Sequence, residues 1–440
     1  MLYRLIIENF KSFKERNEIS FIPEESMRHA AYKDSFAPVL RDAVIYGANA
    51  AGKSNIVKAI DFIRKIVVSN KMSSIVPGLA FRMDEKTKFK QSLFVLEIRI
   101  RDKLYQFGIV ISFVRGVILQ EWLKEYSPDE KSWKIVYTRI LKDEADEYEV
   151  LFKYPLNSEN ASRYQTYRID IASSVKVVAL YELASKNISG DAFIDAVNSV
   201  FNWFSELIIV FPNSKYNLLG RLVKDLETVN ELYKKYFKIF GIDIDEIRLS
   251  EVPINYISLS DEIKESIRQD LMKDNGESMA MIHGQNQDYL AKLSSDKNLE
   301  LLEVKFVHNQ EQYEVEFSQA EESDGTQRLF DLIPMLGYIL ESNKVAIVDE
   351  IDRSLHCLLT QELLKYFLSN TEERCSQLIC TTHQVILMDL KLLGRKEIWF
   401  VERNKKASVI FPLDLYKFYG DTLNVADNFL IGGFGGIPKY

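Results

Sequence analysis

A lysine and a serine that follow two spaced glycines could bind the phosphates of a nucleotide. Residues 47–54 read Gly-Ala-Asn-Ala-Ala-Gly-Lys-Ser, with four residues between Gly47 and Gly52. In this spacing the glycines let backbone N–H groups face an anion, the lysine reaches the phosphates, and the serine hydroxyl binds Mg²⁺. The sequence therefore predicts a phosphate-binding loop in which both glycines and Lys53 contact a nucleoside triphosphate, with Ser54 as a metal ligand.

A strand and a helix must hold such a loop, and the flanking residues have both patterns. The apolar run 44–46 comes directly before the loop and is typical of a buried strand. After the loop, apolar residues recur at helical spacing along 56–67. We therefore expect an amphipathic helix whose N-terminus directs a partial positive charge at the phosphates. A chance match in an irregular loop would lack this strand–loop–helix context.

Paired acids at the end of a second apolar run could complete the chemistry. Residues 345–348 are Val-Ala-Ile-Val, and Asp349 and Glu350 follow them. A buried parallel strand ends at the edge of the sheet where open α/β folds bind ligands. Asp349 is predicted to hold Mg²⁺ through water, and Glu350 to orient and deprotonate the attacking water. Many strands end in acids, so the prediction of triphosphate hydrolysis depends on the phosphate-binding loop as well.

Two shorter patterns lie on either side of these acids along the chain. Residues 322–328 read Glu-Ser-Asp-Gly-Thr-Gln-Arg, just before apolar residues at helical spacing along 330–340. Thr-Thr-His at 381–383 ends the next apolar run. Serine and glycine are also common at helix N-caps and turns, so Ser323 and Gly325 have a purely structural alternative. Their place in the series of motifs gives them a second interpretation.

The order of phosphate-binding loop, Ser-x-Gly, Asp-Glu and His resembles the ATP-binding cassette (ABC) ATPases. That resemblance implies that Ser323 and Gly325 close over ATP held by the loop of a second copy, and that His383 contacts the γ-phosphate. Asn49 and Asn55 resemble the G-x-N-x-x-G-K-S-N form of the SMC, RecF and OLD branches, which implies that both belong to the nucleotide site. Transporter cassettes carry Leu-Ser-Gly-Gly-Gln where this chain has Glu-Ser-Asp-Gly-Thr, so a transport role is not expected.

Within these branches the sequence resembles the AAA-type ATP-binding proteins of bacterial anti-phage systems, such as the ATPase subunits of the Septu and PARIS systems and the RloA group. The segments that carry the resemblance are 322–329, 349–356, 381–383, 397–402 and the terminal Gly-Gly-Ile-Pro. The resemblance implies an ATPase that works as a homodimer or higher oligomer and serves as the sensor or regulatory subunit of a defence system. A separate nuclease-like protein would be the effector.

The motifs lie at both ends of the chain, which predicts one discontinuous α/β ATPase head of the ABC type. Residues 1–175 would supply the phosphate-binding loop and an antiparallel β subdomain, because apolar and polar residues alternate with period two along 93–126. Residues 176–300 are expected to be a helical insertion, since apolar residues recur at helical spacing along 193–236. Residues 301–440 would supply the Ser-x-Gly, Asp-Glu and His motifs.

Composition narrows the remaining functions. The 440 residues carry a formal net charge of −8 and are 47% hydrophobic, which fits a globular protein and argues against a basic coat for nonspecific nucleic-acid binding. A local basic groove for nucleic acid stays open. No apolar run is long enough to cross a bilayer and residues 1–13 do not resemble a signal peptide, so a cytoplasmic protein without membrane contact is expected.

The cysteines and most of the histidines lack the spacing of a metal site. Cys357, Cys375 and Cys380 contain no pair spaced as in a zinc knuckle, and we interpret them as reduced core residues. The histidines without ligand neighbours in the sequence are His29, His283, His308 and His356. The only metal that the sequence predicts is therefore the Mg²⁺ of the nucleotide.

Two other functions stay open at this level. A genome-maintenance ATPase of the RecF or SMC kind would act on DNA ends or gaps, and DNA would stimulate its ATPase rate. An ATP-dependent scaffold would assemble partners and bind ATP tightly with negligible turnover. Measured turnover, with and without DNA, separates these alternatives from the defence ATPase.

Overall fold

The computed structural model describes most of the chain as two compact units. The described residues are 1–24, 29–33, 35–142, 147–153, 161–174, 177–186, 191–212, 226–273, 279–283, 288–310, 313–416 and 425–434. The first unit contains Met1–Ile209, Asn343–Ile351 and Thr371–Tyr440, and the second contains Val210–Ser342 and Asp352–Asn370. Each unit is therefore assembled from segments that are far apart in the sequence.

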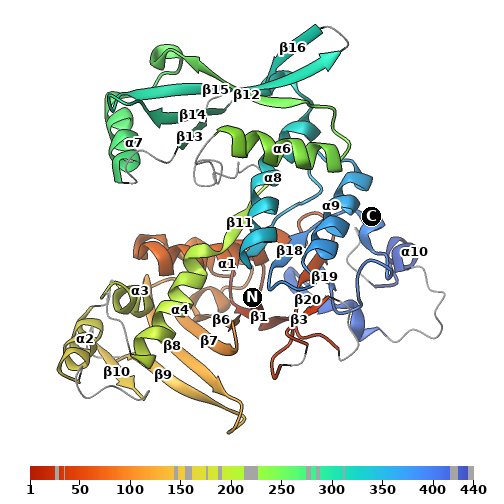
Figure 1. Ribbon diagram of the computed structural model, residues 1–440. Coiled ribbons are helices and arrows are strands. Elements are labelled where there is room, and N and C mark those ends of the chain that lie inside the picture. The colour runs from red at the N-terminus through yellow and green to blue at the C-terminus, as the bar shows by residue number, and fades with distance from the viewer. Residues whose placement is uncertain are drawn as a thin grey trace. The chain divides into compact units, whose positions relative to one another are not determined.

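A largely parallel sheet of six described strands carries the loop motifs of the first unit (Figure 1). In spatial order the strands are β11 (Ile208–Val210), β17 (Val345–Val348), β18 (Gln377–Thr381), β5 (Asp42–Tyr46), β19 (Ile398–Asn404) and β20 (Ala407–Pro412). Strands β17, β18, β5 and β19 run parallel, and β20 pairs antiparallel with β19. Every residue of β5 is buried, as expected for a central strand covered on both faces.

Helix α1 (Lys53–Ser69) begins directly after the glycine-containing loop that follows β5. Its buried residues include Ile56, Ile60 and Ile63, which are apolar positions of the predicted helical pattern. Phe62 packs against Phe94, with ring centroids 5.7 Å apart. The predicted strand–loop–helix unit is therefore confirmed.

An antiparallel sheet of seven described strands lies in the same unit. Its spatial order is β10 (Tyr148–Phe152), β9 (Ser132–Leu141), β8 (Val117–Ser127), β7 (Lys103–Ser112), β6 (Ser92–Ile100), β1 (Leu2–Glu8) and β2 (Asn17–Ser20). Figure 1 shows β6 to β9 as consecutive orange strands. The predicted antiparallel subdomain is confirmed, and with it the mixed α/β class of the fold. Strands β1 and β2 join the sheet because β1 pairs with β6.

Two described helices that fall within the predicted insertion, which begins at residue 176, belong to the first unit instead. They are α3 (Ala179–Ala184) and α4 (Ala192–Glu206), and they follow α2 (Ala161–Ser173) of the same unit. The apolar stripe of α4 is buried, and Phe204 meets the Phe107 ring of β7 with centroids 5.4 Å apart. The predicted boundary is therefore corrected, because the stripe completes the core of the antiparallel sheet.

The remaining described elements of the first unit are short. They are β3 (Ala30–Ala31), β4 (Val39–Leu40), α10 (Val425–Leu430) and the 3-10 turns Met72–Ser74, Pro77–Leu79, Thr87–Phe89, Val385–Leu387 and Leu413–Leu415. Of the cysteines, only Cys380 is buried, so the interpretation of all three as core residues is wrong for Cys357 and Cys375. Both of these are half-buried, since Cys357 begins α9 and Cys375 lies in the irregular segment before β18.

The second unit contains an antiparallel sheet, and three of its described strands lie where the sequence predicts a helical insertion. Its strands are β12 (Glu246–Val252), β15 (Leu299–Gln310), β14 (Asp288–Leu293) and β13 (Ala280–His283), in that spatial order, and β16 (Tyr313–Ser318) also pairs with β15. The prediction of a helical insertion over 176–300 is wrong for β12, β13 and β14. Helical spacing ends near Gly241 and Pro253, and the apolar residues that follow pair across strands, such as Leu290 with Leu302.

Four of the described helices accompany this sheet in the second unit. They are α6 (Leu226–Ile239), α7 (Asp261–Lys273), α8 (Asp324–Ser342) and α9 (Cys357–Asn370), with 3-10 turns at Ile254–Tyr256 and Gln319–Glu321. Tyr233 of α6 stacks on Phe330 of α8 with ring centroids 4.6 Å apart, so the aromatic stripe of α6 is core. Among the described helices of the whole chain, none is both long and apolar enough to span a bilayer.

Candidate nucleotide-binding site

The glycine loop follows the carboxyl end of β5, and its two glycines lie where no side chain would fit. A Cβ atom on Gly47 would lie 2.4 Å from the carbonyl oxygen of Val401 in β19. A Cβ atom on Gly52 would lie 2.3 Å from Oγ of Ser408, and the φ angle of Gly52 is +118°. Both glycines are therefore required by close approach of neighbouring strands, and Gly52 also by its backbone conformation.

Lys53 and His383 meet at this loop. The Lys53 side chain is buried, and its Nζ donates hydrogen bonds to the carbonyl oxygens of Gly47 at 2.7 Å and Ala48 at 3.2 Å. The same nitrogen lies 3.4 Å from Nδ1 of His383, which follows β18 and is exposed. The sequence motifs that carry these two residues therefore converge on one place.

The two predicted Mg²⁺ ligands are within hydrogen-bond distance of each other. Ser54 Oγ donates to Oδ1 of Asp349 at 3.2 Å, and Asp349 is 2% exposed. A hydroxyl and a carboxylate oxygen are the hard ligands that Mg²⁺ prefers, together with water and phosphate oxygens. The donor set therefore fits the predicted metal. It lies at the carboxyl ends of β5 and β17, where parallel strands of one sheet end together.

Thr381 is a residue of this site for which no role was predicted from the sequence. Its Oγ1 donates to Oδ1 of Asp349 at 2.6 Å and accepts a hydrogen bond from the backbone N–H of Glu350 at 2.8 Å. Its carbonyl oxygen accepts from the N–H of Ile351 at 3.0 Å. Thr381 therefore fixes the turn that carries both acids. A threonine at the end of the strand next to the acidic strand is the signal that could have identified it.

Glu350 has a backbone conformation that residues other than glycine seldom adopt. Its φ angle is +50°, in the left-handed region, which costs about 1 kcal/mol or more for such a residue. The hydrogen bonds to Thr381 hold the chain in this conformation, and the Glu350 side chain is half-buried. Strain of this kind at the end of the strand that carries both acids is compatible with the predicted role of Glu350 as the general base, which stays a prediction.

The two asparagines of the loop motif have different surroundings. Asn49 is exposed in the turn of the loop. Asn55 donates its amide to Oγ of Ser12 at 2.8 Å, and the carbonyl oxygen of Ser12 accepts from the N–H of Ser408 at 2.7 Å. The side chain of Asn55 thus ties the start of α1 to the segment after β1. Its predicted contact with the nucleotide stays a prediction, as does that of Asn49.

Ser323 and Gly325 belong to the second unit, where they begin α8. Ser323 Oγ accepts a hydrogen bond from the N–H of Thr326 at 3.1 Å, which is the geometry of an N-cap. A Cβ atom on Gly325 would lie 3.1 Å from the carbonyl oxygen of Ser354. Ser323 therefore has the purely structural role of a helix N-cap that the sequence analysis gave as the alternative. It is compatible with a contact to phosphate, because a helix N-terminus attracts anions.

Solved structures that resemble the chain are SMC head domains. The head domain of the Thermotoga maritima protein has a TM-score of 0.40 and 13% identity, covering 93% of this chain and 98% of that one. An SMC head bound to the C-winged helix domain of ScpA has a TM-score of 0.45 and 13% identity, covering 93% and 97%. An Smc head with an extended coiled coil, bound to the C-terminal domain of ScpA from Pyrococcus furiosus, has a TM-score of 0.43 and 12% identity, covering 94% and 96%.

A family model matches most of the sequence, whereas no curated protein was found to match it. The matched residues are 43–389, which include the glycine loop, the Ser-x-Gly segment, the paired acids and His383. They therefore contain all the motifs on which the candidate site depends. By this match the chain belongs to the family described as "AAA domain, putative AbiEii toxin, Type IV TA system".

Proposed function

We propose that this protein hydrolyses ATP with Mg²⁺ at the glycine loop. The observation that carries the proposal is the pair of hydrogen bonds that Asp349 accepts from Ser54 and Thr381. The bond from Ser54 brings two hard oxygen ligands together at the phosphate-binding loop, and Thr381 also accepts a hydrogen bond from the N–H of Glu350. Membership of an AAA-domain family supports the same chemistry.

Each side chain has a separate role in the proposed reaction. Lys53 offsets the negative charge of the phosphates, and the backbone N–H groups at the start of α1 bind them. Mg²⁺, when bound, neutralises charge on the β- and γ-phosphate oxygens. Glu350 takes a proton from water as the water oxygen attacks the γ-phosphorus, and the bond from that phosphorus to the ADP oxygen breaks.

The proposed enzyme works as a homodimer or a higher oligomer with shared ATP sites. Ser323 and the N-terminus of α8 would contact the γ-phosphate held by the loop of a second copy. Because the γ-phosphate contacts both copies, ATP favours the closed dimer and hydrolysis removes that preference. The ATPase cycle is thus a two-state element that another protein can sense.

The proposed biological role is control of a separate effector in bacterial anti-phage defence. The description of the matched family names a toxin of a toxin–antitoxin system, which supports a role of this kind. The resemblance to the ATPase subunits of defence systems, carried by the segments around Ser323, Asp349 and His383, supports it as well. The partner would be a nuclease-like protein encoded beside this one.

Turnover by a Glu350→Gln variant tests the enzymatic proposal. The purified chain should release phosphate from ATP in the presence of Mg²⁺, and Glu350→Gln should bind ATP but lose at least about 100-fold in turnover, because the amide keeps the shape and loses the base. Glu362→Gln, on the exposed face of α9, is the matched control and should hydrolyse ATP normally. Equal turnover in Glu350→Gln and the wild type would remove Glu350 from the reaction.

A further inference from the structure

A second polar cluster lies at the opposite edge of the parallel sheet from the nucleotide site. Asp42 is the first residue of β5, and Glu397 comes directly before β19, which pairs with β5 in parallel. The glycine loop instead follows the last residue of β5. Since a strand rises about 3.3 Å per residue, the five residues of β5 separate the two edges by roughly 15 Å.

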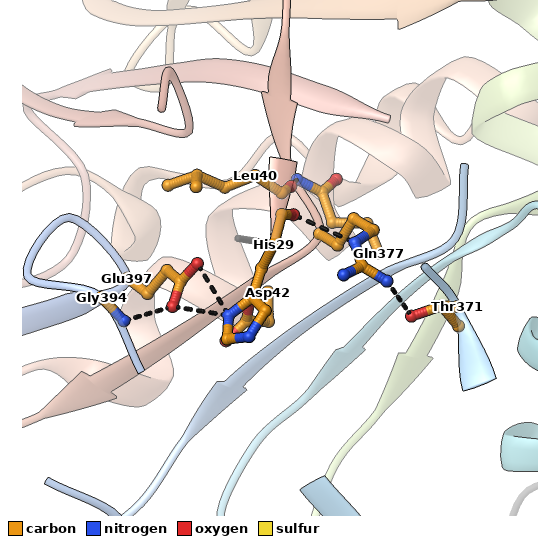
Figure 2. A network of polar contacts seen from close by, with 8 residues as sticks. His29, Leu40, Asp42, Thr371, Gln377, Gly394 and Glu397 are labelled. Atoms are coloured by element: carbon orange, nitrogen blue, oxygen red, sulfur yellow. Dashed lines mark hydrogen bonds and ion pairs between the residues drawn. The ribbon is translucent and has the colours of Figure 1, made fainter. Parts of the chain in front are cut away.

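His29 joins these two carboxylates, as Figure 2 shows. Its Nδ1 lies 3.1 and 3.0 Å from the two carboxylate oxygens of Glu397 and 3.6 Å from Oδ1 of Asp42. One donor atom from each of the three residues lies within 4.8 Å of the others. The interpretation that His29 lacks ligand neighbours is therefore wrong, because the neighbours come from distant parts of the chain.

The Asp42 carboxylate is buried, and no donor among the described residues bonds to it. Asp42 and Glu397 are both 0% exposed. Glu397 accepts a hydrogen bond from the N–H of Gly394, whereas neither oxygen of Asp42 accepts one from the residues that the structure describes.

The neighbouring arginine does not supply hydrogen bonds to this carboxylate. Arg41 directs its Nε to the carbonyl oxygen of His29 at 3.1 Å and one terminal nitrogen to Oγ1 of Thr371 at 2.8 Å. As the residue directly before Asp42, it still places a positive charge near that carboxylate. Two buried carboxylates side by side nevertheless need a further positive charge between them, either a proton or a metal ion.

We propose that His29, Asp42 and Glu397 bind a divalent transition-metal ion of the zinc class. One imidazole nitrogen and two carboxylate oxygens are a donor set that Zn²⁺ accepts, with a fourth position left for water. In a tetrahedral site with metal–ligand bonds of about 2.0 to 2.1 Å, neighbouring ligand atoms lie about 3.3 Å apart. The separations of 3.0 and 3.6 Å from His29 Nδ1 lie on either side of that value.

The donor set also favours a different kind of metal ion from the Mg²⁺ expected at the nucleotide. Mg²⁺ and Ca²⁺ take oxygen ligands, whereas an imidazole nitrogen suits zinc and other first-row metals. A zinc-class ion at this place would tie the segment that carries His29 and β3 to the starts of β5 and β19. Its role is therefore structural, and it takes no part in ATP hydrolysis.

Zinc binding by the full chain, purified without nucleotide, tests the proposal. The wild type should retain one Zn²⁺ per chain after dialysis, measured by elemental analysis, and zinc at a hundredfold excess over its Kd should raise the melting temperature by about 5 °C. His29→Ala should weaken zinc binding by at least about 100-fold, measured by competition with a chromophoric chelator. His29 is 17% exposed in its side chain, so this variant should still fold.

Three further variants make the result specific. Asp42→Asn keeps the shape of the side chain and should also lose zinc. His308→Ala removes a histidine that pairs with Glu322 in the second unit, and Asp349→Asn alters the nucleotide site, so both should keep the wild-type affinity for zinc. Zinc retained by His29→Ala and Asp42→Asn would show that the ion binds elsewhere in the chain. No zinc bound by the wild type would show that the cluster holds a proton. Either result would overturn the proposal.

Discussion

Nζ of Lys53 lies 3.4 Å from Nδ1 of His383, although 330 residues separate them along the chain. The contact exists because β5 and β18 are adjacent parallel strands, so the residues that follow them meet at one edge of the sheet. The same adjacency brings Thr381 to the paired acids. The candidate site is thus a property of strand order, and each of its parts can be tested separately.

Removal of the Lys53 ammonium should weaken ATP binding itself. A hydrogen bond to a charged group contributes about 1.5 to 3 kcal/mol, so Lys53→Ala should raise the Kd for ATP by roughly 10- to 150-fold. Lys58→Ala, on the exposed face of α1, should bind ATP like the wild type. Titration calorimetry with a slowly hydrolysed ATP analogue measures both. An unchanged Kd in Lys53→Ala would place the phosphates elsewhere.

Mixed oligomers should reveal whether the ATP sites are shared. Lys53→Ala and Ser323→Arg should each lack ATPase activity when purified alone. A mixture of the two chains should recover part of it, because one composite site then has an intact loop from one copy and an intact Ser-x-Gly segment from the other. Phosphate release is measured on heterodimers isolated through two different affinity tags. Inactive heterodimers would indicate that each chain acts by itself.

Thr381 should act through the acids that it positions. Thr381→Val keeps the volume but removes the hydroxyl, which leaves Asp349 without one donor and the N–H of Glu350 without its acceptor. We expect kcat to fall about 10- to 100-fold while KM for ATP changes little, since Lys53 still binds the phosphates. Thr381→Ser should restore most of kcat. A loss confined to protein stability, with normal kcat in the folded fraction, would contradict a positioning role.

Glu121 should be a major contributor to the stability of the antiparallel subdomain. Its buried carboxylate accepts hydrogen bonds from the hydroxyl of Tyr137 at 2.8 Å and from the N–H groups of Ala179 and Leu180, both at 2.9 Å, and lies 3.9 Å from Arg139. Glu121→Ala leaves the buried Arg139 without its counter-charge, so the free energy of unfolding should fall by about 3 to 5 kcal/mol.

The free energy of unfolding is measured by urea unfolding, and Tyr137→Phe is the control for Glu121→Ala. Tyr137→Phe removes a single hydrogen bond to Glu121 and should cost only about 1 kcal/mol. A Glu121→Ala variant as stable as Tyr137→Phe would mean that the charge of Arg139 is already balanced by other groups. Both variants should keep the ATP affinity of the wild type if they remain folded.

Protection against phage should require a second gene. Expression of this chain alone should be harmless and should give no protection, whereas co-expression with a neighbouring nuclease-like gene should lower phage titres. That protection should disappear with Lys53→Ala or Glu350→Gln, while Glu362→Gln should leave it intact. Degradation of DNA or RNA by the isolated chain with ATP and Mg²⁺ would show that no separate effector is needed.

Local patterns were sufficient to predict the parts of the fold that are determined locally. The apolar run before Gly47, the glycine spacing and the helical spacing after Ser54 are all contained in one short segment, and the structure confirms them. Period-two alternation similarly predicted the meander that contains β6 to β8. In each case neighbouring residues in the sequence are also neighbours in the element, so spacing alone carries the information.

Relationships between distant segments were beyond those patterns. Thr381 becomes part of the site only because β18 lies next to both β17 and β5. His29 meets Glu397 only because β19 pairs with β5. The strands β12 to β14 were missed because the helical spacing of α6 was extended past two helix breakers into short segments whose apolar residues pair across the sheet. Knowledge of strand order, which no single segment contains, would have been needed.

The position of β5 between β18 and β19 also affects how the chain is made. Both partners of β5 are encoded near the end, with Leu378 opposite Asp42 and Ile398 opposite Val44. At a synthesis rate of about 5 to 20 residues per second, β5 is synthesised roughly 20 to 70 s before either of its neighbouring strands. During that interval an apolar strand has two unpaired edges, which favours aggregation and recruitment of chaperones. Supply of this protein in the cell should therefore depend on cotranslational protection of its first half.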